Sequence, residues 1–174
     1  MIPFLPSYIP PGVDMNQVKA DVADDGVSVP PADAADVPAL RQVVAEAKQK
    51  GIDLKIVVIQ HNPPIDTPLR DIASEVGKDH PGSTVLAISP SWAGTYSTHF
   101  DRVTLEAGQD LAKTGDPVQS SKNFVSELTT QHFPWTPFTI VLVLAVIAAV
   151  VVTRVLQVRG KWAAAADAAS DSAD

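Results

Sequence analysis

The sequence predicts a layered α/β domain with a mixed sheet, followed by one C-terminal transmembrane helix. Two observations predict this class. Short β-branched runs alternate with amphipathic helical segments between residues 14 and 132, which is typical of strands and helices packed in layers. An uncharged, apolar run then extends from Phe133 to Thr153. A bilayer core requires roughly 20 apolar residues in a helix, so this run is long enough to cross it.

The flanks of the apolar run favour a membrane span over its alternative, a buried core helix of a soluble domain. Trp135 suits a membrane interface, and Pro137 limits backward extension of the helix. Arg154 lies close enough to the other end to extend its guanidinium to the headgroups. We therefore expect a transmembrane helix over 138–158. Within the tail, the segment from Ala163 to Asp174 consists of Ala, Asp and Ser, so we expect it to be disordered or weakly helical.

The N-terminal stretch MIPFLPSYIPPG contains four prolines and lacks both a basic region and a long apolar core. We therefore expect a flexible, extended lead-in at 1–13 and not a signal peptide. The predicted organisation is the lead-in, an α/β domain at 14–132, a transmembrane helix at 138–158 and a short tail at 159–174.

The strands and helices of the domain are predicted from periodicity, caps and turn residues. The segment 52–59 is continuous and β-branched at its centre, which indicates a strand buried on both faces. Asp116-Pro117 has the order of a helix N-cap and first helical residue. The expected elements are a helix from Asp14 to about Ala23, a short edge strand at 27–29, a helix from Asp33 or Asp36 to Gly51, a strand at 52–59, a helix from Asp66 or Thr67 ended by Gly77, a strand at 84–89, a tight loop from Pro90 to Gly94, a strand at 95–100 that pairs with the preceding one as a hairpin, and helices at 103–113 and 117–130.

Composition excludes several kinds of protein. The formal net charge is −7 and the chain offers no basic patch, which argues against nucleic acid as a partner. Cysteine is absent, so disulfides, thiol nucleophiles and cysteine-based zinc sites are excluded. The sequence has no GxSxG, GxGxxG or P-loop motif, so we expect no nucleotide cofactor and predict no catalytic residue.

The candidate ligand or interaction surface lies in loops that follow predicted strands. His61, Asn62 and Asp66 come after the strand at 52–59, and Trp92 and Tyr96 lie around the loop after the next strand. Because α/β sheets bind ligands outside the carboxyl ends of their strands, we expect these residues to share one surface. Trp92 and Tyr96 suit contact with a protein or a sugar polymer if exposed, and cap the core if buried; both readings remain open.

Histidines offer a second interpretation of the same loops. His61 and His99 follow strands that we expect to be neighbours, so they could approach each other near Asp66 and Asp101. Such a group would suit a mixed nitrogen and oxygen metal site or an acid–base pair. The alternative is that the segment from His61 to Pro64 is only a rigid, solvated turn.

Two sets of motifs carry a resemblance to known families. The stretches ADDGVSVP, GIDLKIVVIQ and HPGSTVLAISP resemble the TPM-domain group of small α/β modules, some of which are described as acid phosphatases or calcium binders. The stretches HNPPIDTPLRDIASEVG, GTYSTHFDRVTLEAG and FPWTPFTIVLVLAV resemble an actinobacterial, mycobacterial-type family of single-pass membrane proteins of unknown function. Its genes are often found beside secreted peptidoglycan endopeptidases. This likeness implies a cell-envelope setting and no established activity.

These observations lead to two hypotheses of function. The first is a non-enzymatic interaction or regulatory module, anchored in the bilayer and linked to peptidoglycan hydrolases or other envelope proteins. The alternative is a metal-dependent phosphatase-like hydrolase. The basic residues Arg154, Arg159 and Lys161 follow the span, whereas only Lys122 precedes it closely. This asymmetry predicts a cytoplasmic tail and an α/β domain outside the cytoplasm.

Overall fold

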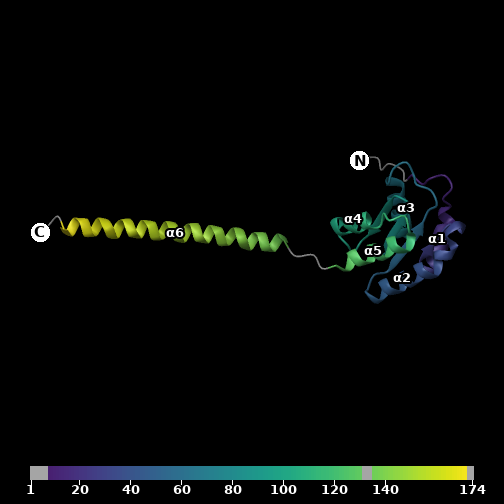
Figure 1. Ribbon diagram of the computed structural model, residues 1–174, viewed down its shortest axis with the longest axis horizontal. Helices are drawn as coiled ribbons and strands as arrows, with labels where there is room; N and C mark the ends of the chain where they lie inside the picture. Colours follow the sequence, from purple (N-terminus) through teal and green to yellow (C-terminus); the bar gives the residue numbers. More distant parts are fainter. Residues whose placement is uncertain (1–7, 131–134, 172–174) are drawn as a thin grey trace. The chain divides into compact units, whose positions relative to one another are not determined.

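The computed structural model describes residues 8–130 and 135–171 and confirms the α/β fold class with one C-terminal apolar helix (Figure 1). The chain divides into two compact units, Met1–Thr130 and Gln131–Asp174. The elements in chain order are α1 (Met15–Asp25), β1 (Val27–Ser28), the 3₁₀ helix η1 (Pro31–Asp36), α2 (Val37–Gln49), β2 (Leu54–Val58), α3 (Thr67–Asp79), β3 (Thr84–Ile88), β4 (Ala93–Ser97), α4 (Arg102–Leu111), α5 (Pro117–Thr129) and α6 (Trp135–Asp171).

The first unit contains a four-stranded mixed sheet in the order β1-β2-β3-β4. β2 pairs in parallel with β1 and with β3, and β3 pairs antiparallel with β4. The expected hairpin and the expected edge position of the first strand are therefore confirmed. β2 is central and largely buried, as its continuous apolar sequence predicts.

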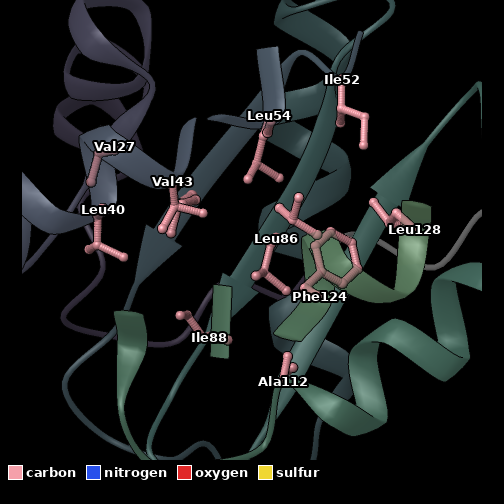
Figure 2. Packing of buried hydrophobic residues seen from close by; sticks show 14 of the residues in the cluster. Val27, Leu40, Val43, Ile52, Leu54, Leu86, Ile88, Ala112, Phe124 and Leu128 are labelled. Carbon is pink, nitrogen blue, oxygen red and sulfur yellow. The ribbon is translucent and has the colours of Figure 1, made fainter. Parts of the chain in front are cut away.

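Alternate residues of β2 and β3 face two separate hydrophobic clusters. One face packs against α2, α4 and α5, where Phe124 is the largest fully buried side chain. Figure 2 shows the ring of Phe124 in this cluster beside Leu86 and Leu128. The other face packs against α1 and α3, where Val22 and Ile72 are fully buried. The sheet is thus covered by helices on both sides.

The two parallel connections leave the sheet on opposite faces. The chain passes from β1 to β2 through α2 on one face, and from β2 to β3 through α3 on the other. Both connections advance in the same direction across the sheet, from β1 to β2 and from β2 to β3. Two crossovers that advance in the same direction but cover opposite faces must have opposite handedness. One of the two crossovers is therefore left-handed, against the strong general preference for right-handed connections.

The hairpin begins earlier than the sequence predicts. The N–H of Ser89 donates to the carbonyl of Trp92 across 2.9 Å, so the turn consists of Pro90 and Ser91 only. Gly94 lies inside β4 and not in the loop. A side chain is excluded at this position because α3 packs directly on it. A Cβ at Gly94 would overlap the backbone of Leu69 and Arg70.

The prediction that Gly77 ends its helix is also wrong. Gly77 is buried within α3, which continues to Asp79. The ring of Tyr96 occupies the space that a Cβ at Gly77 would need. This glycine therefore serves close packing between helix and strand, which local sequence does not distinguish from a helix stop.

Two predicted caps are confirmed and two lack the expected side-chain bond. Asp14 accepts from the N–H groups of Asn16 and Gln17, and Asp116 accepts from that of Gln119. Asp36 and Asp66 occupy N-cap positions but make no side-chain cap bond, since both already have helical backbone angles. The 3₁₀ helix η1, which delays the start of α2 to Val37, is not predicted by the sequence.

An ion cluster holds α1 on α3. Lys19 reaches Asp79 at 2.8 Å and Glu75 at 3.5 Å. The hydrogen bond from Lys19 lowers the pKa of the Asp79 carboxyl, and the bond from Lys78 lowers the pKa of Glu75. These groups are close to solvent, so we assign the cluster an orienting role and little stability. These contacts with α3 fix α1 beside the carboxyl end of β1.

The second unit contains α6, which begins at Trp135 and includes the predicted span at 138–158. Its segment Trp135–Trp162 has 28 residues, is exposed along its length and is long and apolar enough to cross a membrane. Pro137 falls in the first turn, where a missing N–H costs nothing. The helix continues through residues 163–171, which agrees with the helical alternative of the expected disordered or weakly helical tail. The end of the predicted α/β domain, at 131–132, lies outside the described residues.

We predict that Gly94→Ala destabilises the domain by about 1–3 kcal/mol, because its methyl group would force α3 away from β4. Urea unfolding of the full chain in detergent, followed by circular dichroism, measures this. Gly160→Ala is the matched control, since a Cβ there meets no atom within 4 Å. An unchanged midpoint for Gly94→Ala would contradict the close contact.

Candidate functional site

The candidate site lies at the carboxyl ends of the parallel strands, and we call this end of the sheet its carboxyl edge. Chain leaving β1 turns to one face of the sheet and chain leaving β2 turns to the other. Neighbouring strands whose connections diverge in this way leave a crevice outside their carboxyl ends, which is where α/β sheets bind ligands. The divergence at β1 and β2 therefore specifies the position of a binding crevice.

A groove of about 350 Å³ occupies this crevice. We call it the edge groove. It is bounded by the chain before α1, one side of α1, the segment after β1 and the segment after β2. The lining residues are Pro10, Pro11, Gly12, Val13, Asp14, Gln17, Val18, Asp21, Ser28, Val29, Pro30, Pro31, Val58, Ile59, Gln60 and His61. The volume lies at the lower end of the range for small-ligand sites.

Asp21 is held in the edge groove by two side-chain hydrogen bonds. Its Oδ1 accepts a hydrogen bond from Gln17 Nε2 at 2.6 Å, and its Oδ2 accepts one from Ser28 Oγ at 3.0 Å. Both donors are neutral. These bonds fix the carboxylate between α1 and β1 and leave its negative charge in place.

A second, smaller pocket of about 160 Å³ lies between the ends of β2 and β3. Gln60 and Ile59 belong to both cavities, so the end of β2 forms the wall between them. The start of α5 closes the second pocket, with Ser120 buried and hydrogen-bonded to Thr114 at 2.7 Å.

Asn62 joins the two loops that the sequence places on one surface. Its Oδ1 accepts from Ser89 Oγ and from the N–H of Ser91, each at 2.8 Å. Its Nδ2 donates to Ser91 Oγ at 3.0 Å. The loop after β2 and the turn between β3 and β4 are therefore held together at the carboxyl edge.

The other predicted site residues are distributed around this edge. His61 is exposed on the wall of the edge groove, and Asp66 is partly exposed at the start of α3. Trp92 is partly buried against the cluster under α3, with Lys113 Nζ 6.0 Å from its ring centroid. Tyr96 lies opposite Val85 within β4 and away from the turn. Both aromatic rings thus contribute to the core while remaining partly accessible.

The expected approach of His61 and His99 is wrong. β4 runs antiparallel to β3, with Ser97 opposite Thr84, so the chain after β4 emerges at the amino edge of the sheet. There His99 Nε2 lies near Gly82, in the loop that precedes β3. Among the residues that the structure describes, no three His, Asp or Glu side chains are grouped so as to hold a metal ion.

Sequence reasoning missed the part of the site before β2. Asp21 looks like an ordinary exposed helix residue, and Pro10-Pro11 and Pro30-Pro31 look like simple chain breaks. The available signal was the pair of proline dipeptides on either side of a short helix and strand. Their convergence depends on tertiary packing of α1 against α3.

Comparison with known proteins shows sequence similarity over most of the chain. The family described as "Membrane protein Rv1476" matches residues 8–168. The curated protein "Membrane protein Rv1476" of Mycobacterium tuberculosis (strain H37Rv) is 58% identical over 174 residues, which cover 99% of this chain and 92% of that protein. No solved structure matches the chain.

We predict that Asn62→Ala loosens the carboxyl edge without unfolding the domain. Loss of a hydrogen bond worth about 1 kcal/mol should raise amide exchange at Ser91 by roughly 5- to 10-fold, measured by hydrogen–deuterium exchange. His61→Ala is the control, because it alters the adjacent exposed side chain and leaves the Asn62 bonds in place. Equal exchange at Ser91 in both variants would contradict the role of Asn62.

Proposed function

The chain belongs to the Rv1476 family of membrane proteins, and from this we propose that it is a membrane-anchored, non-enzymatic interaction or regulatory module of the bacterial cell envelope. α6 supplies the anchor. The α/β domain supplies the binding surface at the carboxyl edge of its sheet.

The observation that carries this proposal is the crevice where the connections after β1 and β2 diverge. Its walls come from the lead-in, α1 and the ends of two strands, so it is formed by the fold as a whole. The bonds of Asn62 hold the neighbouring loops in place. A fixed surface of this kind lowers the entropic cost of binding a partner.

The proposed partners are other envelope proteins, and peptidoglycan hydrolases are the specific class that we propose to test. An anchor confines the domain to a layer close to the membrane and so raises its effective concentration toward partners there.

The proposed orientation places the α/β domain outside the cytoplasm. The supporting feature is the cluster of Arg154, Arg159 and Lys161 after the apolar run.

No observation favours the hydrolase alternative. Its strongest residue pair was His61 with His99, and these histidines lie at opposite edges of the sheet. We therefore develop the interaction module alone.

We predict that reporter fusions place the N-terminus outside the cytoplasm and the C-terminus inside. A reporter active only in the cytoplasm should give signal from the C-terminal fusion and none from the N-terminal fusion. Replacing the three basic residues after the apolar run with glutamine should weaken this asymmetry, because they determine the bias. Signal from the N-terminal fusion alone would overturn the orientation.

We also predict that a partner contacts the carboxyl edge in intact cells. A photoreactive amino acid at Gln60, exposed between the two cavities, should yield discrete protein adducts on illumination. The matched control is Thr98, which is equally exposed but lies beyond the other end of β4. Mass spectrometry identifies the adducts. Their absence at Gln60, or equal adducts at both positions, would refute binding through this edge.

A further inference from the structure

The edge groove is rich in hydrogen-bond acceptors and contains no cationic side chain of lysine or arginine among its lining residues. Asp14 and Asp21 contribute carboxylates, and Gln60 contributes an amide. The four prolines of the lining have no N–H to donate, so their backbone contributes only carbonyl acceptors. A ligand that forms hydrogen bonds with these acceptors must supply the donor groups.

Within residues 8–130, no ion pair neutralises the charge of Asp21. The ion pairs that the structure describes for α1 join Lys19 to α3 and Asp25 to Arg41. The side-chain donors that the structure describes at Asp21 are the neutral groups of Gln17 and Ser28. A carboxylate retains lone pairs after two such bonds, so it can accept a further, charge-assisted bond.

Asp14 contributes less to the potential of the groove. It caps α1 through Oδ1, where the positive end of the helix dipole offsets part of its charge. Asp21 lies two turns further along the same helix, beyond the first turn in which that dipole acts. The strongest attraction for a cation therefore lies at Asp21.

The rest of the edge groove is apolar. Val18, Val58 and Ile59 are buried at its base, and the proline rings form rigid walls. An aliphatic chain that ends in a cation matches this arrangement, since its methylene groups can cover the apolar base while its head reaches Asp21. Lysine and arginine side chains have this form.

We propose that the edge groove binds an extended peptide segment of a partner protein through a lysine or arginine side chain. The proposal rests on the proposed function, because it takes the same crevice as the binding surface and specifies the chemistry of the partner. The groove volume of about 350 Å³ accommodates a few residues and not a folded domain. The recognised feature is therefore a short basic segment that is accessible in the partner.

The test uses the full chain in nanodiscs of phosphatidylcholine, whose headgroup carries no net charge. The probe is the capped pentapeptide Gly-Val-Lys-Val-Gly, and its matched control has norleucine in place of lysine, which keeps the methylene chain and removes the charge. Isothermal titration calorimetry should show roughly three- to fivefold tighter binding of the lysine peptide, the size expected for a partly exposed ion pair. This preference should fall as the salt concentration rises from about 0.05 M to 0.5 M, as expected for an ion pair exposed to solvent.

Substitutions of individual aspartates test which carboxylate binds the lysine side chain of the peptide. Asp21→Asn should weaken binding of the lysine peptide roughly threefold and leave binding of the norleucine peptide unchanged. Asp14→Asn should have a smaller effect, and asparagine preserves the helix cap. Asp24→Asn is the matched control, because it removes the same charge from an exposed position of α1 outside the groove. Circular dichroism of each variant shows that the fold is retained.

Three results would overturn the proposal: equal affinities for the lysine and norleucine peptides, equal losses in Asp21→Asn and Asp24→Asn, or no binding at millimolar peptide. If any of these occurred while Gln60 still gave specific adducts in cells, the carboxyl edge would remain a binding surface with a different partner chemistry. Failure of both experiments would reject the proposed function itself.

Discussion

Burial of β2 on both of its faces is the constraint on which the rest of the domain depends. A strand that lies between two parallel neighbours and carries apolar side chains in both directions must be covered by helices from both sides. α2 covers one face of β2 and α1 covers the other, with α3 beside α1 over β3 and β4. The connections through α2 and α3 therefore diverge to opposite faces of the sheet. The same divergence opens the crevice at the carboxyl end of β2, so the packing of the core and the position of the site have one cause.

Features determined by neighbouring residues could be predicted from the sequence. The β-branched run of β2, the caps at Asp14 and Asp116 and the uncharged run of α6 each depend on contacts within a few residues or on the bilayer as solvent. The association of the loops around Asn62 also followed from a local rule, because strands that run in parallel end at the same edge.

Features determined by distant residues could not be predicted. Gly77 and Gly94 resemble a helix stop and a loop residue, but each is small because another element packs against it. The edge groove combines residues before α1 with residues after β2, and no local pattern indicates that these segments meet. In each case the information lies in tertiary contacts.

The opposite hands of the two crossovers bear on how the domain arose. Handedness does not change under rotation, so no rotation superposes the unit from β1 to β2, with α2 on one face, onto the unit from β2 to β3, with α3 on the other. Tandem duplication of a single βαβ ancestor would give two connections of the same hand. The two units are therefore not superposable copies of one βαβ unit, and an alignment of one half of the sheet with the other would pair residues that are not equivalent.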